Sequence, residues 1–194
     1  MTVLAVERRV REVRRIGPGE ALELAVLGAA RAGDIEIERL TTVVQQVGDT
    51  CWHPTETVVL GCVEALLAAG CLEAVEARRA ALSPVLRATE AGRRHLRSLL
   101  CADAGDPGET VFRAVMLMKV AFLDALEPAG RWSVVDGLAA AVETARLRHE
   151  TDVADCPLRS AGLTLALGHE GRRLAGEVAW LRALRTAVAE GIRA

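Results

Sequence analysis

The chain has 194 residues and a formal net charge of −2 at pH 7, and 51% of its residues are hydrophobic. This length predicts one or two small domains, and the near-neutral charge provides no overall basic field that would attract nucleic acid. Aromatic residues make up only 3% and tyrosine is absent, so small aliphatic side chains must fill the core, which favours closely packed helices. No apolar run approaches the roughly 20 residues that span a bilayer, so we expect no membrane association.

The first predicted helix runs from Thr2 to Ile16 and carries valines at helical spacing with five arginines between them. Two interpretations stay open: a basic arm that touches phosphates or a partner, and an amphipathic helix in a dimer interface with a solvated basic face. Its apolar segment is too short for a signal peptide. Together with five cysteines that lack paired spacing, this predicts a cytoplasmic protein in a reducing compartment.

Three further helices are predicted before residue 70, each with apolar residues at helical spacing and a glycine near its end. They span Glu20–Ala32, Glu36–Val47 and Pro54–Ala69. Thr55 is placed to cap the last of them, because a threonine hydroxyl accepts a hydrogen bond from the first free backbone N–H groups of a helix.

Two short strand-like runs follow, Cys71–Glu76 and Ser83–Ala88, with Arg78 and Arg79 between them, and a capped helix then opens at Thr89. Helices followed by a two-stranded ribbon and a closing helix are typical of a winged helix-turn-helix domain, in which one helix lies in a DNA major groove and the ribbon contacts the backbone. We therefore predict a mainly α fold. Residues 1–102 are predicted to form the winged helix-turn-helix DNA-binding domain, with a small two-stranded wing.

Residues 101–108 read as a linker, and the chain from residue 109 to 194 is predicted to be an all-helical dimerisation and effector domain. Its helices span Glu109–Leu126, Trp132–Asp152 and Leu158–Ile192, with a break at Pro128-Ala-Gly130. The large side chains of this tail are either a dimer core or the lining of a ligand pocket between subunits. The candidates for ligand binding are Met116, Phe122, Trp132 and Trp180.

Candidate DNA contacts are few, because the helix Pro54–Ala69 contains no basic residue. Thr55 and Thr57 lie near its start, where a helix N-terminus favours a phosphate. Arg78, Arg79 and Arg87 are placed to make contacts from the wing. The competing interpretations are a solvated hairpin tip for the two neighbouring arginines and simple helix capping for Thr55.

Catalytic and metal chemistry is not indicated. Cys51 and His53 form a single loose pair, whereas zinc sites usually show two close ligand pairs. Cys51 or Cys101 as a redox sensor is a weaker alternative, because reactivity requires a lowered pKa that a sequence does not reveal. The motifs of serine hydrolases, nucleotide-binding loops and zinc proteases are missing, so we expect no enzyme, no cofactor and no metal.

Five stretches resemble motifs of the PadR family of transcriptional regulators, in the family's order and over a similar length. They are Ala21–Arg31, Leu66–Leu72, Arg87–Arg94, Leu117–Phe122 and Glu177–Leu181. The Thr-Glu-Ala-Gly-Arg piece inside the third stretch also occurs in other winged-helix families such as MarR. The resemblance implies a homodimeric repressor that binds double-stranded DNA with two winged helices about one helical turn apart. It also implies a small-molecule effector that changes their spacing.

Several positions depart from the family pattern, and most of them concern DNA contacts. Leu60 stands where the family usually has tyrosine in the recognition helix, and Glu64 stands where basic residues are common. The usual tyrosine pair of the wing falls on Val85 and Leu86. These departures motivate an alternative from another functional class, namely a winged-helix scaffold that has lost DNA binding and acts through small-molecule or protein contacts.

Overall fold

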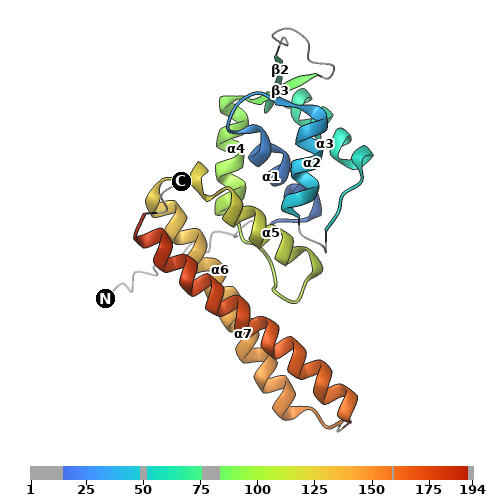
Figure 1. The fold of residues 1–194 in the computed structure, drawn as a ribbon, viewed down its shortest axis with the longest axis vertical. Coiled ribbons are helices and arrows are strands. Elements are labelled where there is room, and N and C mark those ends of the chain that lie inside the picture. Colours follow the sequence, from blue (N-terminus) through green and yellow to red (C-terminus); the bar gives the residue numbers. More distant parts are fainter. Residues whose placement is uncertain (1–14, 49–51, 76–83, 159, 192–194) are drawn as a thin grey trace, which may run out of the picture.

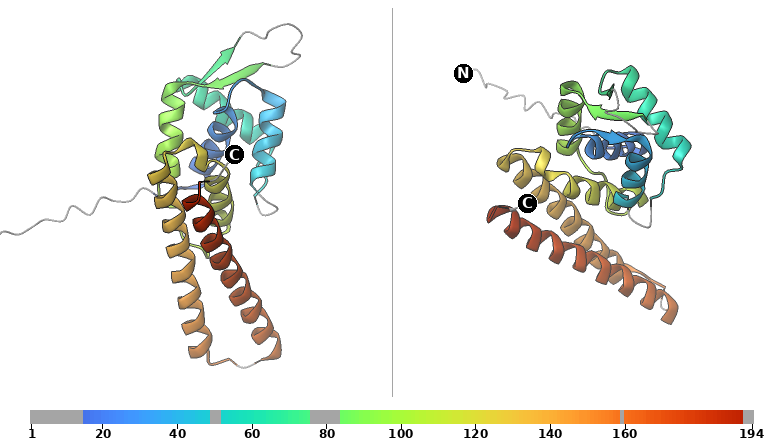
Figure 2. Two further views of the ribbon diagram at one scale, coloured as in Figure 1. Left: turned by 60° about the vertical axis from the view of Figure 1, so that its left-hand side comes forward. Right: turned by 45° about the horizontal axis from the view of Figure 1, so that its top comes forward.

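The computed structural model describes residues 15–48, 52–75, 84–158 and 160–191. Within these residues, helices α1 to α5 and a small sheet form a body, and two long helices form a hairpin that extends away from it (Figure 1). Figure 2 shows from two further directions that the far end of the hairpin lies away from the body. The predicted mainly α fold with a winged helix-turn-helix is confirmed.

Helix α1 (Pro18–Ala30) forms the centre of the body, and most of its side chains are buried. Pro18 opens the helix with a preset φ angle, and the Glu20 carboxylate accepts a hydrogen bond of 2.9 Å from the backbone N–H of Gly17. Four helices pack around it, namely α2 (Ile37–Val47), α3 (Glu56–Ala68), α4 (Glu90–Cys101) and α5 (Thr110–Ala121). Because partners surround it, α1 is apolar on nearly all sides.

The sheet is antiparallel, and its strand order is β1-β3-β2. Its strands are β1 (Ile35–Glu36), β2 (Leu72–Val75) and β3 (Val85–Ala88). The two-stranded ribbon predicted from the sequence is present as β2 and β3, and β1 adds a third strand that the sequence did not reveal. Two residues directly after a glycine break are too few to show an alternating pattern. Arg78 and Arg79, between β2 and β3, lie outside the described residues.

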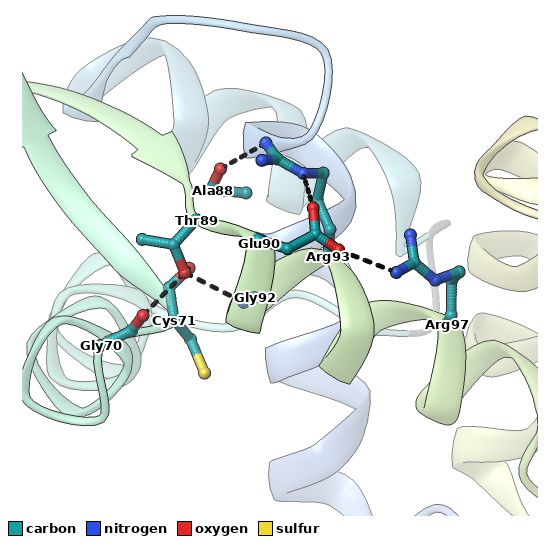
Figure 3. A network of polar contacts seen from close by, with 8 residues as sticks. All are labelled: Gly70, Cys71, Ala88, Thr89, Glu90, Gly92, Arg93 and Arg97. Carbon is teal, nitrogen blue, oxygen red and sulfur yellow. Dashed lines mark hydrogen bonds and ion pairs between the residues drawn. The ribbon is translucent and has the colours of Figure 1, made fainter.

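Thr89 joins the wing to α4 and is the helix cap that the sequence predicts (Figure 3). Its hydroxyl oxygen accepts a hydrogen bond of 3.1 Å from the N–H of Gly92 and donates at 2.7 Å to the Gly70 carbonyl. The Thr89 N–H also donates to the Cys71 carbonyl at 3.0 Å. One threonine therefore ties the end of α3, the start of β2 and the start of α4 together.

Helix α5 (Thr110–Ala121) and the short 3-10 turn η1 (Leu123–Ala125) follow the linker and complete the body. Helix α5 contacts α1 and α2. The Phe122 ring lies so close to Gly28 of α1 that a Cβ there would approach ring carbons to 2.2 Å. The division of the chain between residues 102 and 109 stays a prediction, and α5 shares the core of the helices before it.

The hairpin consists of α6 (Pro128–Asp155) and α7 (Ala161–Ala189), which pack on each other. Pro128 occupies the first turn of α6, so the predicted break at this proline is where the helix starts, and α6 begins four residues earlier than Trp132. Proline suits a first turn because the N–H it lacks has no partner there. Among the helices of the described residues, none has the length and hydropathy needed to cross a membrane.

The predicted N-terminal helix Thr2–Ile16 lies outside the described residues except at its last two positions. There the structure differs from the prediction, because Arg15 forms a parallel bridge with Asp103 and Ile16 donates its N–H to the Asp103 carbonyl at 2.9 Å. The Ile16 side chain is buried. Arg15 and Ile16 are therefore extended and pair with the linker after α4, where the sequence predicted a helix.

Candidate nucleic-acid interface

Helices α2 and α3 form the helix-turn-helix pair. Val59, Val63 and Leu66 point from α3 into the core and are nearly fully buried. The opposite side of α3 faces solvent, and Val58 there is 52% exposed. The side of α3 that faces away from the core is therefore open to a ligand.

Thr55 and Thr57 both lie in the exposed first turn of α3. Thr55 occupies the N-cap position, but its hydroxyl accepts no capping hydrogen bond, which corrects the expectation that it caps the helix. Its backbone carbonyl accepts the N–H groups of Val58 and Val59 instead. The first turn thus offers hydroxyl groups and the positive end of the helix dipole to a ligand.

The charge on this side of α3 is acidic. The only charged side chains on the helix are Glu56 and Glu64, both exposed. Arg39 of α2 and His53 before α3 are exposed as well, and Arg39 carries a positive charge. Because phosphate contacts usually supply much of the affinity for DNA, the described part of the interface is a weak electrostatic match to a phosphate backbone.

Arg87 on β3 already has acidic partners within the protein. Its guanidinium lies 2.6 Å from the Asp34 carboxylate and 4.0 Å from that of Glu73, its neighbour across the sheet. A phosphate would have to compete with these carboxylates. Of the three wing arginines predicted to contact DNA, Arg87 is therefore held in place but partly neutralised. Arg78 and Arg79 lie outside the described residues.

The tail brings two of the four predicted ligand-binding residues together. Met116 of α5 and Trp180 of α7 line a cavity of about 370 Å³, together with Leu117 and Gly176. Met116 is buried, whereas Trp180 is 37% exposed at the side of the cavity. The apolar lining suits the hydrophobic part of a small molecule.

The cavity is also surrounded by charged groups that the sequence pattern did not indicate as part of a site. Arg173 donates to the carboxylates of Glu170 and Glu177, and Arg113 lies 3.9 Å from Glu177. The pKa of Arg173 is raised, mainly by its hydrogen bond to Glu170. The Oε2 atom of Glu177 is buried without a hydrogen-bond partner among the described residues. Spacing of three and four residues along α7 hints at the ion pairs, but only the fold reveals the cavity.

The other two predicted ligand residues lie elsewhere. The Phe122 ring packs on α1 at Gly28, with the Arg31 guanidinium 5.2 Å from its centroid. Trp132 of α6 stacks with Arg185 of α7 at 4.8 Å. These are cation–π contacts that join helices. Neither residue lines the cavity that holds Met116 and Trp180.

The cysteines give no sign of a metal site in the described part of the chain. Cys51 lies outside it, and no group of three or more potential ligands gathers there. Cys62 is a free thiol whose pKa is raised to about 12, mainly by burial and further by the Glu23 carboxylate. It is therefore a protonated core side chain at neutral pH. Cys101 is an exposed free thiol.

No family model and no curated protein matches the chain. Among solved structures, the chain is similar to Bacillus subtilis PadR in complex with operator DNA, with 18% identity, a TM-score of 0.41, and coverage of 86% of this chain and 98% of that one. It is also similar to Bacillus subtilis PadR alone, with 15% identity, a TM-score of 0.41, and coverage of 90% of this chain and 98% of that one. A third similar structure is Bacillus subtilis PadR in complex with p-coumaric acid, with 16% identity and a TM-score of 0.38. The match covers 90% of this chain and 98% of that one.

Proposed function

We propose that the chain is a PadR-like DNA-binding transcriptional regulator that acts as a cytoplasmic homodimer and represses its target. The observation that carries the proposal is the winged helix-turn-helix itself, in which the first turn of α3 is exposed and carries the hydroxyl groups of Thr55 and Thr57. In this arrangement α3 enters a major groove from its N-terminal end. Arg78 and Arg79, in the segment between β2 and β3, contribute the phosphate contacts that α3 lacks.

Charge reversal in the wing is expected to weaken DNA binding. An Arg78→Glu/Arg79→Glu variant should bind at least roughly tenfold more weakly near 100 mM salt, and its salt dependence should be shallower by about two counterions per subunit. The matched control is Arg94→Glu/Arg182→Glu, which changes net charge equally at two exposed side chains outside the wing and the distal half of the hairpin. Equal loss in both variants, or unchanged affinity in the wing variant, would remove the wing from the interface.

The distal half of the hairpin supports a homodimer. The buried residues of α6 end at Val142 and those of α7 begin at Leu174, so neither helix buries a side chain fully beyond these points. Large aliphatic side chains nevertheless continue there, with Leu147, Leu158 and Leu165 exposed at 51%, 63% and 71%. Two long helices that remain apolar without burial call for further helices to pack against. A second hairpin supplies them as a four-helix bundle.

Replacement of Leu165 by aspartate is expected to dissociate this dimer. Burial of one leucine contributes about 1.5–3 kcal/mol, so the dimer dissociation constant should rise by at least roughly tenfold. Sedimentation equilibrium of wild type and variant measures this change directly. Val58→Asp on α3 is the matched control, because Val58 is similarly exposed but lies on the body. A dimer that tolerates Leu165→Asp, or a wild-type monomer at all concentrations, contradicts the proposal.

We place effector binding in the cavity between α5 and α7. Its apolar lining receives the body of a small molecule, and Arg172 at its edge is an exposed cation available to an acidic group. The amphipathic anion anilinonaphthalene sulfonate is a suitable probe. Trp180→Ala should weaken its binding at least roughly threefold, since an aromatic wall contributes about 1 kcal/mol or more. Trp132→Ala, outside the cavity, should not, and equal loss in both variants argues against the site.

A specific observation favours the second candidate, a winged-helix scaffold without DNA binding. The exposed side of α3 carries Glu56 and Glu64 but no basic residue, and Arg87 is paired with Asp34. Val58 adds an exposed apolar side chain in the same helix. Such a surface suits a protein partner better than a phosphate backbone. The two candidates are separated by whether the purified protein binds any DNA at low salt.

A further inference from the structure

Lys119 is a buried amine at the joint between the body and the hairpin. It lies in α5 and is 2% exposed. Its Nζ donates to the carbonyl oxygens of Leu100 at 2.7 Å and Ala102 at 2.5 Å, at the C-terminal end of α4. Cys101 and Asp103 act on it electrostatically, without a hydrogen bond to it among the described residues. The amine is thus held by two neutral oxygens.

A cavity of about 280 Å³ adjoins this amine. Its walls come from the end of α4, the linker, α5 and α6, and Lys119 is one of the lining residues. Ser133 and Gly137 contribute from α6, and both are exposed on that helix. A water molecule occupies about 30 Å³ in the liquid, so the cavity has room for a small organic molecule.

The two carbonyl oxygens suit the neutral form of the amine. A neutral amine has two N–H groups and one lone pair, and each N–H here has an acceptor, so the lone pair is left free to react. Burial lowers the pKa of Lys119 to about 8, while Cys101 and Asp103 oppose this shift. More of this amine is therefore neutral near neutral pH than of an ordinary lysine, which is almost wholly protonated. Desolvated lysines are the ones that form imines.

We propose that Lys119 captures a small aldehyde as an imine inside this cavity. The Nζ lone pair attacks the carbonyl carbon and forms the C–N bond, while the C=O π pair moves to oxygen. That oxygen receives a proton from nitrogen and a second from solvent, and it leaves as water with the electron pair of the C–O bond while the nitrogen lone pair forms the C=N double bond. The protonated imine then loses its remaining proton to solvent. The step requires no oxidant or reductant. A neutral imine also adds no negative charge near Asp103, which a carbon dioxide adduct would do.

Imine formation has a structural consequence at the end of α4. A protonated imine has one N–H group and a neutral imine has none, so at least one of the bonds to Leu100 and Ala102 is lost. These bonds join α4, which closes the winged-helix body, to α5. Capture of an aldehyde would therefore loosen the contact between α4 and α5. The chemistry itself is independent of the proposed DNA binding.

The chain offers a sharp test because Lys119 is its only lysine. The full chain is incubated at pH 7.5 with butyraldehyde and sodium cyanoborohydride, which fixes imines as secondary amines, and the modified position is mapped by mass spectrometry. The α-amino terminus is the internal reference. We expect an adduct at Lys119 that forms roughly tenfold faster in the folded chain than in urea, where the pKa of the amine returns to its ordinary value.

Two variants complete the experiment. Gly137→Leu places a side chain in the cavity, at a position where a Cβ meets nothing within 4 Å, and should suppress the Lys119 adduct while the terminus still reacts. Lys119→Arg should leave only the terminal adduct. Modification of the terminus alone in folded wild type overturns the proposal. So does a Lys119 rate that is equal in the folded chain, in urea and in Gly137→Leu.

Discussion

Replacement of Gly92 by alanine is expected to lower the free energy of unfolding by about 3 kcal/mol. A Cβ at Gly92 would lie 2.0 Å from the carbonyl oxygen of Cys71, closer than any real contact. This oxygen belongs to the backbone and accepts hydrogen bonds from the N–H and hydroxyl of Thr89, so it has little freedom to move (Figure 3). The methyl group therefore has to separate α4 from the start of β2.

Urea denaturation of Gly92→Ala and Gly137→Ala measures this effect. Both glycines are helical, but a Cβ at Gly137 meets nothing within 4 Å. Alanine there should raise stability by up to about 1 kcal/mol through helix propensity alone. If both variants gain stability, the close approach of α4 to Cys71 does not exist in solution.

The second large effect is a rise in stability with pH that comes from Lys119. Burial lowers its pKa to about 8 in the folded chain, below the ordinary lysine value of 10.5. Between these values the unfolded chain binds more protons than the folded chain, so the free energy of unfolding increases with pH. Below pH 8 the ammonium is buried at a cost, and this cost disappears as pH approaches 10.5. The total change is about 3 kcal/mol.

The Lys119→Met variant isolates the contribution of Lys119 to the pH dependence of stability, because all other titrating groups of the variant are those of the wild type. Unfolding is followed at equal protein concentration from pH 7.5 to 10.5, and the difference between the two proteins is plotted against pH. The free energy of unfolding of the wild type should rise relative to that of the variant throughout that range. Parallel curves would mean that Lys119 keeps an ordinary pKa and is not desolvated, which would also weaken the basis for imine formation.

The local signals of the winged helix were strong enough to predict it. Thr89 followed by Gly92 gave a helix start, and the structure shows the expected hydrogen bond between them. The apolar run of α1 marked the helix that becomes the centre of the body. These features depend on residues within one turn of each other, where sequence spacing fixes geometry.

Long-range contacts were beyond the reach of the sequence. The Arg87–Asp34 ion pair joins residues 53 positions apart and changes the expected role of the arginine. Among the four large tail residues, only packing of α5 against α7 decides that Met116 and Trp180 share a cavity and Phe122 does not. Pro128 shows a different limit, because a proline marks a helix start as readily as a helix break.

The proposed function rests on whether this winged helix binds DNA despite an acidic α3. The most direct measurement is a titration of the purified full chain against DNA from upstream of its own gene, at about 50 and 200 mM salt, with unrelated DNA of equal length as control. We predict specific binding that weakens steeply with salt, as expected if Arg78 and Arg79 contact phosphates. Absence of binding to either DNA at the lower salt concentration would contradict the regulator and leave the scaffold as the better account.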